Sequence, residues 1–242
     1  PGRPCHPDFM EEVHVASKPV PVVRGVPIYV GLDFGRTPAA IFAQRVGGQI
    51  RFLDELFAVN MGAEQFAERV LIPFVGERFG SLRSSEFFWY GDPRGEDMTQ
   101  VDDRTPFSVF RKHGINVQPA PTNDPAVRLG AIDAALNRMV KGAPGLLVSP
   151  TCKLWIAGAK GKYRFRRLQT QAERYDDKPD KNRYSNPHDA GQYVVLGMGE
   201  GVAYLHGGKL TQPRVVSTTY RPPWARGRNA QRASRAPGAW RA

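Results

Sequence analysis

The sequence contains little cysteine and no long apolar run, and both scarcities narrow the kind of protein that it can encode. Cys5 and Cys152 are the two cysteines among its 242 residues. So few thiols provide no disulfide framework and are typical of a reducing compartment. No apolar run is long enough to cross a bilayer, and the first residues lack the pattern of a signal peptide. We therefore expect a soluble, intracellular protein with no membrane partner.

Acidic residues are also scarce in comparison with basic ones. The chain has 34 Lys and Arg against 23 Asp and Glu, which gives a formal net charge of +11. Such an excess favours a polyanionic partner, although net charge governs association rather than fold. Hydrophobic residues make up 41% of the chain and aromatic residues 10%, which is enough for the core of one compact domain.

Composition divides the chain into three parts. Residues 1–25 are rich in proline and have no sustained period, so we expect a linker that follows an upstream domain. The first residue is Pro1 rather than Met, which agrees with a piece of a longer polypeptide. Residues 207–242 are rich in Arg, Gly and Pro, and their last part, RPPWARGRNAQRASRAPGAWRA, contains no acid, so a disordered basic tail is expected. The folded domain should therefore span residues 26–206.

The periodicity of residues 26–206 predicts a mixed α/β domain. Strands are expected at residues 28–33, 39–45, 49–58, 86–90, 116–118 and 146–148. Helices are expected at residues 63–79, with a kink or break at Pro73, and at 105–113, 125–139, 152–160 and 187–199. Three strands in hairpin succession, followed by alternating strands and helices, predict a mixed central β-sheet flanked by helices. Ribonuclease H-like folds have this order of elements.

Three aspartates stand where the predicted elements begin or end. The stretch VPIYVGLDFGRTPAA is apolar up to Asp33 and then turns through Gly35. Asp92 follows the strand in FFWYGDPRGED, and Asp189 falls in the first turn of the last predicted helix. If the first and fourth strands are neighbours, Asp33 and Asp92 emerge side by side at one sheet edge. The last helix then needs only to lay its first turn over that edge.

Such a group of carboxylates predicts a metal site. Three like charges repel one another, so the arrangement is costly unless a cation neutralises it. Oxygen ligands without His or Cys select Mg²⁺ or Mn²⁺, and two such ions can activate water and stabilise the leaving oxygen in phosphodiester hydrolysis. Each aspartate taken singly also has an ordinary explanation, because Asp favours turns and helix starts. The three positions taken together favour a metal-dependent hydrolase.

Three segments of the chain resemble the C-terminal nuclease domain of tailed-phage terminase large subunits. They are GLDFGRTPAAIFAQ, YGDPRGEDMTQVDDRTPFSVFRKHGI and NRYSNPHDAGQYVVLG, and the resemblance extends from Val26 to roughly Gly201. These subunits are DNA-packaging motors with an N-terminal ATPase and a C-terminal nuclease of ribonuclease H-like fold. The resemblance implies that Asp33, Asp92 and Asp189 are catalytic acids that bind Mg²⁺ or Mn²⁺, with two ions expected.

The same resemblance implies a biological setting. The family cuts concatemeric double-stranded viral DNA when packaging begins and ends, and it works with a portal protein and a small terminase subunit. The expected location is the cytoplasm of an infected bacterial host. The chain has no Walker-type G-x-x-x-x-G-K-[ST] loop, so we expect the ATPase domain to lie upstream of Pro1.

Residues 163–184 are polar and basic, and predict a hairpin or loop that protrudes from the domain. Basic side chains on such a protrusion can contact DNA phosphates. Contacts of this kind fix the position of the DNA without reading its sequence. A solvated charged loop is the alternative explanation. The candidate DNA-binding residues are Arg164, Arg166, Arg167, Lys178, Lys181 and Arg183.

Several residues near the aspartates are weaker candidates. Arg36 and Thr37 could touch a phosphate or simply complete the turn after Asp33. His188 could handle a proton, but an exposed histidine at a helix start is the commoner case, so we leave it out of the catalytic set. A solvated loop and a helix cap better explain the remaining acids, which are Asp97, Asp102 and Asp103.

Other functions remain open from the sequence. An actin- or sugar-kinase-like ATPase could use the GLDFG turn for phosphate, but it would need a second glycine-rich lobe. A Holliday-junction resolvase or a transposase would use the same fold and acids. A DNA- or portal-docking module with vestigial acids is the non-enzyme alternative, and Trp224 and Trp240 in the basic tail could anchor on such a partner.

Overall fold

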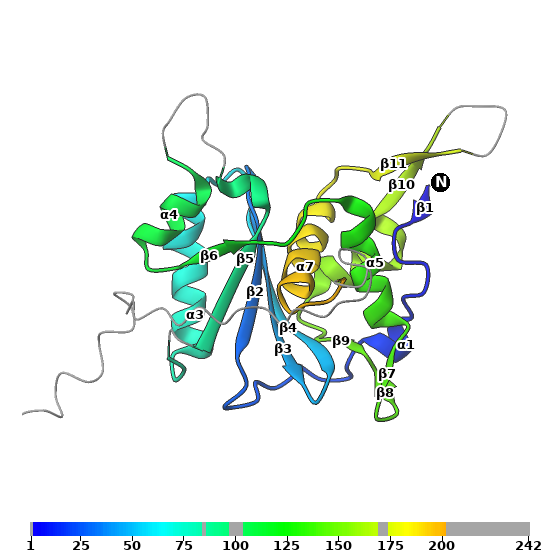
Figure 1. Cartoon of the computed structure of the whole chain (residues 1–242), viewed down its shortest axis with the longest axis horizontal. Helices are drawn as coiled ribbons and strands as arrows, with labels where there is room; N and C mark the ends of the chain where they lie inside the picture. Colours follow the sequence, from blue (N-terminus) through cyan, green and yellow to red (C-terminus); the bar gives the residue numbers. More distant parts are fainter. Residues whose placement is uncertain (1, 84–85, 97–103, 169–173, 202–242) are drawn as a thin grey trace, which may run out of the picture.

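The computed structural model describes residues 2–83, 86–96, 104–168 and 174–201. A six-stranded mixed sheet with the strand order β6-β5-β2-β3-β4-β9 runs through its centre (Figure 1). The strands of this sheet are β2 (Ile28–Asp33), β3 (Ala39–Val46), β4 (Gln49–Phe57), β5 (Phe87–Gly91), β6 (Val117–Pro119) and β9 (Leu146–Val148). The fold predicted from the sequence, a mixed central sheet flanked by helices, is confirmed.

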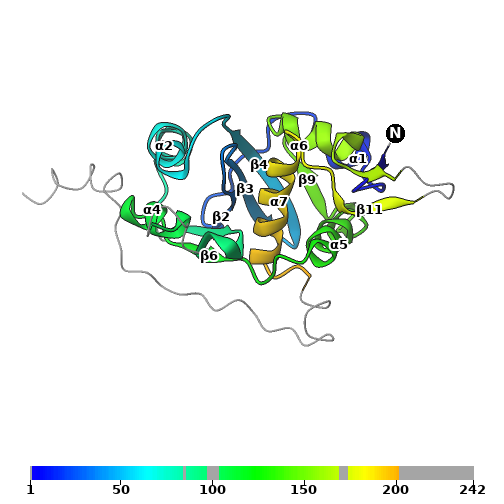
Figure 2. The same cartoon turned by 90° about the horizontal axis from the view of Figure 1, so that it is seen from above.

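Helices cover both faces of the sheet (Figures 1 and 2). On one face lie α5 (Pro125–Leu136), α6 (Lys153–Ala157), continued by the π-helical η4 (Gly158–Lys162), and α7 (Ser185–Gly197). On the other face lie α4 (Pro106–Lys112) and a long helix made of α2 (Ala63–Phe66), η1 (Ala67–Leu71) and α3 (Ile72–Phe79). Each face therefore has its own apolar core.

The smaller elements lie around this framework. They are β1 (Arg3–Pro4), α1 (Glu11–His14), the 3-10 turn η3 (Pro93–Glu96), β7 (Met139–Val140), β8 (Ala143–Pro144), β10 (Arg164–Arg167) and β11 (Tyr175–Pro179). The strands β10 and β11 pair antiparallel, so residues 163–184 contain the hairpin that the sequence predicted.

The pairing of β2 fixes the edge of the sheet at which the first two aspartates emerge. β2 pairs antiparallel with β3 and parallel with β5, and Leu32 lies opposite Gly91 in that parallel pair. Asp33 and Asp92 are the next residues of the two chains. Parallel neighbours end at the same edge, so the two aspartates leave the sheet together, as the sequence predicted.

Gly31 allows the last helix to lie directly on β2. A Cβ atom added at Gly31 would overlap the carbonyl oxygen of Ala190 and lie 2.8 Å from the backbone nitrogen of Val194. Only a residue without a side chain permits so close an approach of two backbones. α7 is thereby held over the strand that ends in Asp33.

The last helix begins earlier than the sequence predicted. Ser185, rather than Pro187, is its first residue, and Tyr184 is its N-cap without a side-chain hydrogen bond. The turn before it is closed by Asn182, whose side-chain oxygen accepts from the Tyr184 backbone N–H at 2.9 Å. Asp189 is therefore the fifth residue of α7, in its second turn. A stabilising charge at the helix start is a poor explanation for an acid at that place.

The helix predicted over residues 63–79 runs through Pro73 without a break, and its irregularity is a π-helical turn that ends at Leu71. Pro73 has no N–H and its ring crowds the preceding turn, and the wider π-helical turn of η1 stands immediately before it.

Residues 2–25, predicted as a linker, pack against the domain instead of standing apart from it. Cys5, His6, His14 and Val20 are buried, and β1 extends the β10–β11 pair into a three-stranded sheet. These contacts are made by isolated residues in a proline-rich segment. No hydrophobic periodicity in the sequence therefore predicted them. A connection to an upstream domain stays a prediction, and residues 207–242 lie outside the described part. In that part no helix has the length and apolar character to cross a membrane.

Candidate functional site

Asp33 and Asp92 leave the sheet at the edge where β2 and β5 end, and Asp189 of α7 lies near enough for its charge to act on Asp33. Asp33 is 9% exposed and Asp189 is 3% exposed, whereas Asp92 is half-buried. Burial raises the pKa of Asp33 well above its ordinary value, and the charges of Asp189 and Asp92 raise that pKa further. Lys181 and Arg128 act on the same carboxyl in the opposite direction. The carboxylates thus lie close enough to feel one another's charge.

Asp189 is held by two cations of different character. The Nζ of Lys181 donates to its Oδ2 at 2.6 Å, and the NH1 of Arg128 donates to its Oδ1 at 3.3 Å. The Lys181 side chain is 72% exposed, whereas that of Arg128 is 9% exposed. The hydroxyl of Tyr163 lies 3.4 Å from the same Oδ1. One partner of Asp189 is therefore open to solvent and the other partners are buried.

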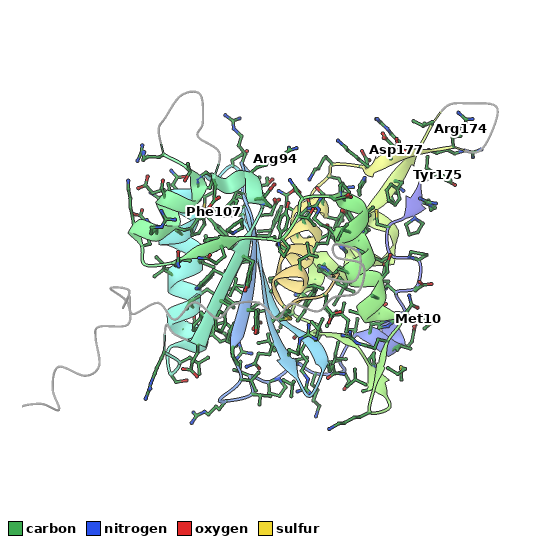
Figure 3. The ribbon with its side chains drawn as sticks, viewed as in Figure 1. Met10, Arg94, Phe107, Arg174, Tyr175 and Asp177 are labelled. Atoms are coloured by element: carbon green, nitrogen blue, oxygen red, sulfur yellow. The ribbon has the colours of Figure 1, made fainter. Side chains whose placement is uncertain are left out.

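Asp92 is fixed by the turn that follows β5 and by a distant loop. Its Oδ1 accepts from the backbone N–H of Arg94 at 3.0 Å and from the Nδ2 of Asn123 at 2.9 Å. Figure 3 labels Arg94, which lies at this edge of the sheet. The first bond is ordinary turn chemistry, as the sequence allowed. The second joins Asp92 to the segment that leads into α5.

The donor set at this edge suits a hard divalent cation. Three carboxylates could supply oxygen ligands, and such a set without histidine or cysteine favours Mg²⁺ or Mn²⁺ over softer metals. Arg128 and Lys181, which both pair with Asp189, bring positive charge to this group of acids.

The remaining candidate residues have other surroundings. His188 was expected to be exposed, but it is fully buried: its Nε2 lies 2.9 Å from the Trp155 carbonyl oxygen, and its ring stacks on Tyr163. Burial lowers the pKa of His188 well below its ordinary value. The Asn186 amide of α7 donates to Thr37, which secures the turn after Asp33. Asp97, Asp102 and Asp103 lie outside the described residues.

Most of the predicted DNA-binding residues lie on the exposed hairpin, which projects from the body of the domain (Figure 1). Arg164, Arg166, Arg167 and Lys178 belong to β10 and β11, and an ion pair of 3.5 Å joins Arg166 to Asp176. Lys181 and Arg183 follow β11, and Lys181 reaches back to Asp189. Arg183 lies over the ring of Tyr184 at 5.8 Å.

The sequence interpretation missed Arg128, Asn123 and Tyr193, which connect the aspartates. A signal for Arg128 existed: it lies three and four positions before Ala131 and Ile132, on the buried face of α5. A basic residue on an apolar helix face indicates a buried acidic partner. Asn123 and Tyr193 carry no comparable signal.

A second group of metal-ligand types lies on the opposite side of the sheet. Glu64, Glu68 and His113 offer ligand atoms within 4.8 Å of one another. Both glutamates are exposed, and Arg104 lies 3.5 Å from Glu64. Exposed acids of this kind are common on solvated helices, so we give the group no role.

Comparison with solved structures relates this arrangement to known proteins. A large terminase from a thermophilic bacteriophage has a TM-score of 0.60 and 22% identity over 79% of this chain and 44% of its own. The large terminase nuclease of the thermophilic phage G20c with bound magnesium has a TM-score of 0.53 and 12% identity, over 80% of this chain and 96% of its own. The P22 large terminase nuclease domain has a TM-score of 0.52 and 12% identity, over 80% of this chain and 91% of its own.

The chain has the fold of a large terminase nuclease domain, which is ribonuclease H-like. It spans less than half the length of the first of these large terminases but nearly all of the two nuclease domains. No family model and no curated protein matches the sequence. At these identities the terminase likeness describes the fold, and the chemistry must be argued from the residues of the site.

Proposed function

We propose that this domain is a metal-dependent endonuclease that cuts double-stranded viral DNA during genome packaging. The observation that supports it best is that Asp33 and Asp92 leave one sheet edge together, with the pKa of Asp33 raised by burial and by the charges of Asp189 and Asp92. Buried acids whose pKa is raised by burial and by neighbouring acids are typical of functional sites.

In this proposal the three aspartates hold Mg²⁺ or Mn²⁺, with two ions expected. The bound ions would activate water and stabilise the leaving oxygen of a phosphodiester. The chain's own part is to orient three carboxylates from β2, β5 and α7 and to bring DNA to them. The basic residues of the β10–β11 hairpin, including Arg164, Arg166 and Arg167, would contact DNA phosphates and would not select a DNA sequence.

The proposal also includes the setting implied by the terminase likeness. An ATPase domain in the same polypeptide, a portal protein and a small terminase subunit are the expected partners, and the cytoplasm of an infected bacterium is the expected location. The G20c nuclease structure has magnesium bound. This agrees with an oxygen-ligand site for a hard cation.

Supercoiled plasmid provides the direct test. The chain should nick and linearise it in Mg²⁺ or Mn²⁺ and leave it intact in chelator, and Asp33→Asn should remove the cutting. Equal cutting with and without metal, or no cutting even when a motor domain is attached, would contradict the proposal. Four-way junctions assayed beside linear duplex separate the resolvase alternative, because a resolvase would prefer the junction by a wide margin.

A further inference from the structure

Arg128 is an unusual residue to find inside the domain. It lies on α5, its side chain is 9% exposed, and it faces the 4% exposed side chain of Asp189. Burying a guanidinium is costly unless it is paired and hydrogen-bonded. A guanidinium keeps its proton in proteins. Arg128 is therefore a permanent cation beside the acids.

The position of this cation is fixed by Tyr193. The NH1 of Arg128 donates to the Tyr193 hydroxyl at 2.9 Å, and the guanidinium carbon lies 5.0 Å from the centre of the Tyr193 ring. Both Tyr193 and Asp189 belong to α7, one turn apart. Arg128 thus holds one face of the helix that carries Asp189, and it does so through two independent contacts.

The same tyrosine extends the contact to Asp92. Its hydroxyl donates to the Oδ1 of Asn123 at 3.0 Å, and the Nδ2 of Asn123 donates to the Oδ1 of Asp92 at 2.9 Å. A continuous chain of hydrogen bonds therefore runs from Asp189 through Arg128, Tyr193 and Asn123 to Asp92. Its members come from α7, α5, the loop before α5 and the end of β5.

We propose that Arg128 is a positioning residue of this site, which holds the Asp189 carboxylate in place and, through Tyr193 and Asn123, fixes Asp92 relative to it. The proposal rests on the proposed function. Groups that orient metal ligands from behind typically change metal affinity or activity about 10–100-fold when they are removed. Lys181 fits this role less well, because its side chain is 72% exposed.

Two conservative variants of the 242-residue chain test the proposal. Arg128→Lys keeps the charge but loses the planar fork, and Tyr193→Phe keeps the ring but breaks the chain to Asn123. The matched control is Arg138→Met. Arg138 pairs with Glu200 at 3.1 Å, and the two residues lie just beyond the C-terminal ends of α5 and α7. The control therefore removes an ion pair between the segments that follow the same two helices.

The first readout is Mn²⁺ binding, measured by the electron paramagnetic resonance of free Mn²⁺ on protein shown to be folded by its melting curve. Plasmid cutting, resolved into kcat and KM, is the second. Arg128→Lys and Tyr193→Phe should bind Mn²⁺ about 10–100-fold more weakly and lose kcat with little change in KM for DNA. Arg138→Met should lower the melting temperature and leave Mn²⁺ binding unchanged.

The outcomes separate this proposal from the proposed function. If the wild-type chain cuts, Asp33→Asn does not, and both conservative variants bind Mn²⁺ and cut like wild type, the positioning role is wrong and the nuclease stands. If Arg138→Met weakens Mn²⁺ binding as much as they do, the effect is general loosening of the helix pair, and the positioning role is again wrong. If the wild type neither binds Mn²⁺ nor cuts, the nuclease proposal is wrong, and the positioning role is wrong as well.

Discussion

The acidic sheet edge and the basic hairpin carry opposite charge in opposite surroundings. At the edge, Asp33 and Asp189 are buried, and Asp189 is held by Arg128, Lys181 and Tyr163 from three segments of the chain. On the hairpin, Arg164, Arg166 and Arg167 are exposed and come from one strand. Buried charges interact strongly and demand fixed partners, whereas exposed charges are screened and replaceable. We therefore expect the sheet edge to depend on exact side-chain positions, and the hairpin to contribute a DNA affinity that changes gradually with its charge.

Neutralising the acids should have the largest effect. Asp33→Asn, Asp92→Asn and Asp189→Asn each remove a carboxylate that would hold the ions, so plasmid cutting should fall to the rate without protein. Cutting in Mg²⁺ and Mn²⁺, followed by gel electrophoresis, measures this. A variant that retains more than a small fraction of the wild-type rate would remove its aspartate from the ligand set.

The next effect concerns stability, and it distinguishes two buried acids. Asp189→Asn leaves Arg128 as an uncompensated buried charge, so the metal-free domain should lose about 3–5 kcal/mol of unfolding free energy. Urea unfolding in chelator provides the measurement. The double variant Asp189→Asn with Arg128→Met is the control, since it removes both charges and should recover much of the loss. A single variant as stable as wild type would mean that the buried pair contributes nothing.

Asp33→Asn should behave in the opposite way in chelator. The pKa of Asp33 is raised in the folded state, so its ionised form opposes folding. The wild type should thus lose stability as the pH rises from about 4, where unfolded Asp titrates, through the higher folded value. Asp33→Asn should lack this loss and melt at a higher temperature at neutral pH. Parallel pH profiles for the two proteins would contradict the assignment.

Reversing hairpin charges should have a smaller and graded effect. Arg164→Glu, Arg166→Glu and Arg167→Glu together should weaken binding equally for unrelated duplexes. The slope of log K against log salt should fall by about 0.9 for each phosphate that the variant no longer neutralises. Fluorescence anisotropy over a salt series measures this, with Arg138→Met as a control outside the hairpin. An unchanged slope would take the hairpin out of the DNA path.

The sequence predicted the sheet and its acidic edge because local patterns encode both. Apolar runs ending in Asp33 and Asp92 identify buried strands, and Gly47-Gly48 identifies the hairpin that sets β3 beside β4. The start of α7 was misplaced because Asn182 and Ser185 close a turn that no capping pattern announced. The contacts of Arg128 and Lys181 with Asp189 depend on how separate elements pack, and no local pattern encodes a pairing of that kind. The packing of residues 2–25 was missed for the same reason.

Lys181 connects the hairpin with the acidic sheet edge, and replacing it should have the smallest effect on Mn²⁺ binding. It lies just beyond the hairpin, is 72% exposed, and occupies the Oδ2 of Asp189, an oxygen that the proposed ions require. Because the lysine end of this ion pair is exposed and screened by solvent, removing this competitor in Lys181→Met should tighten Mn²⁺ binding only a few-fold. Lys178→Met, which changes an exposed hairpin lysine of β11, is the matched control and should leave Mn²⁺ affinity unchanged. Titration calorimetry with Mn²⁺ resolves a change of this size. Weaker binding in Lys181→Met would show that the lysine supports the carboxylate rather than competing for it, and the contrast between an exchangeable Lys181 and a fixed Arg128 would then be wrong.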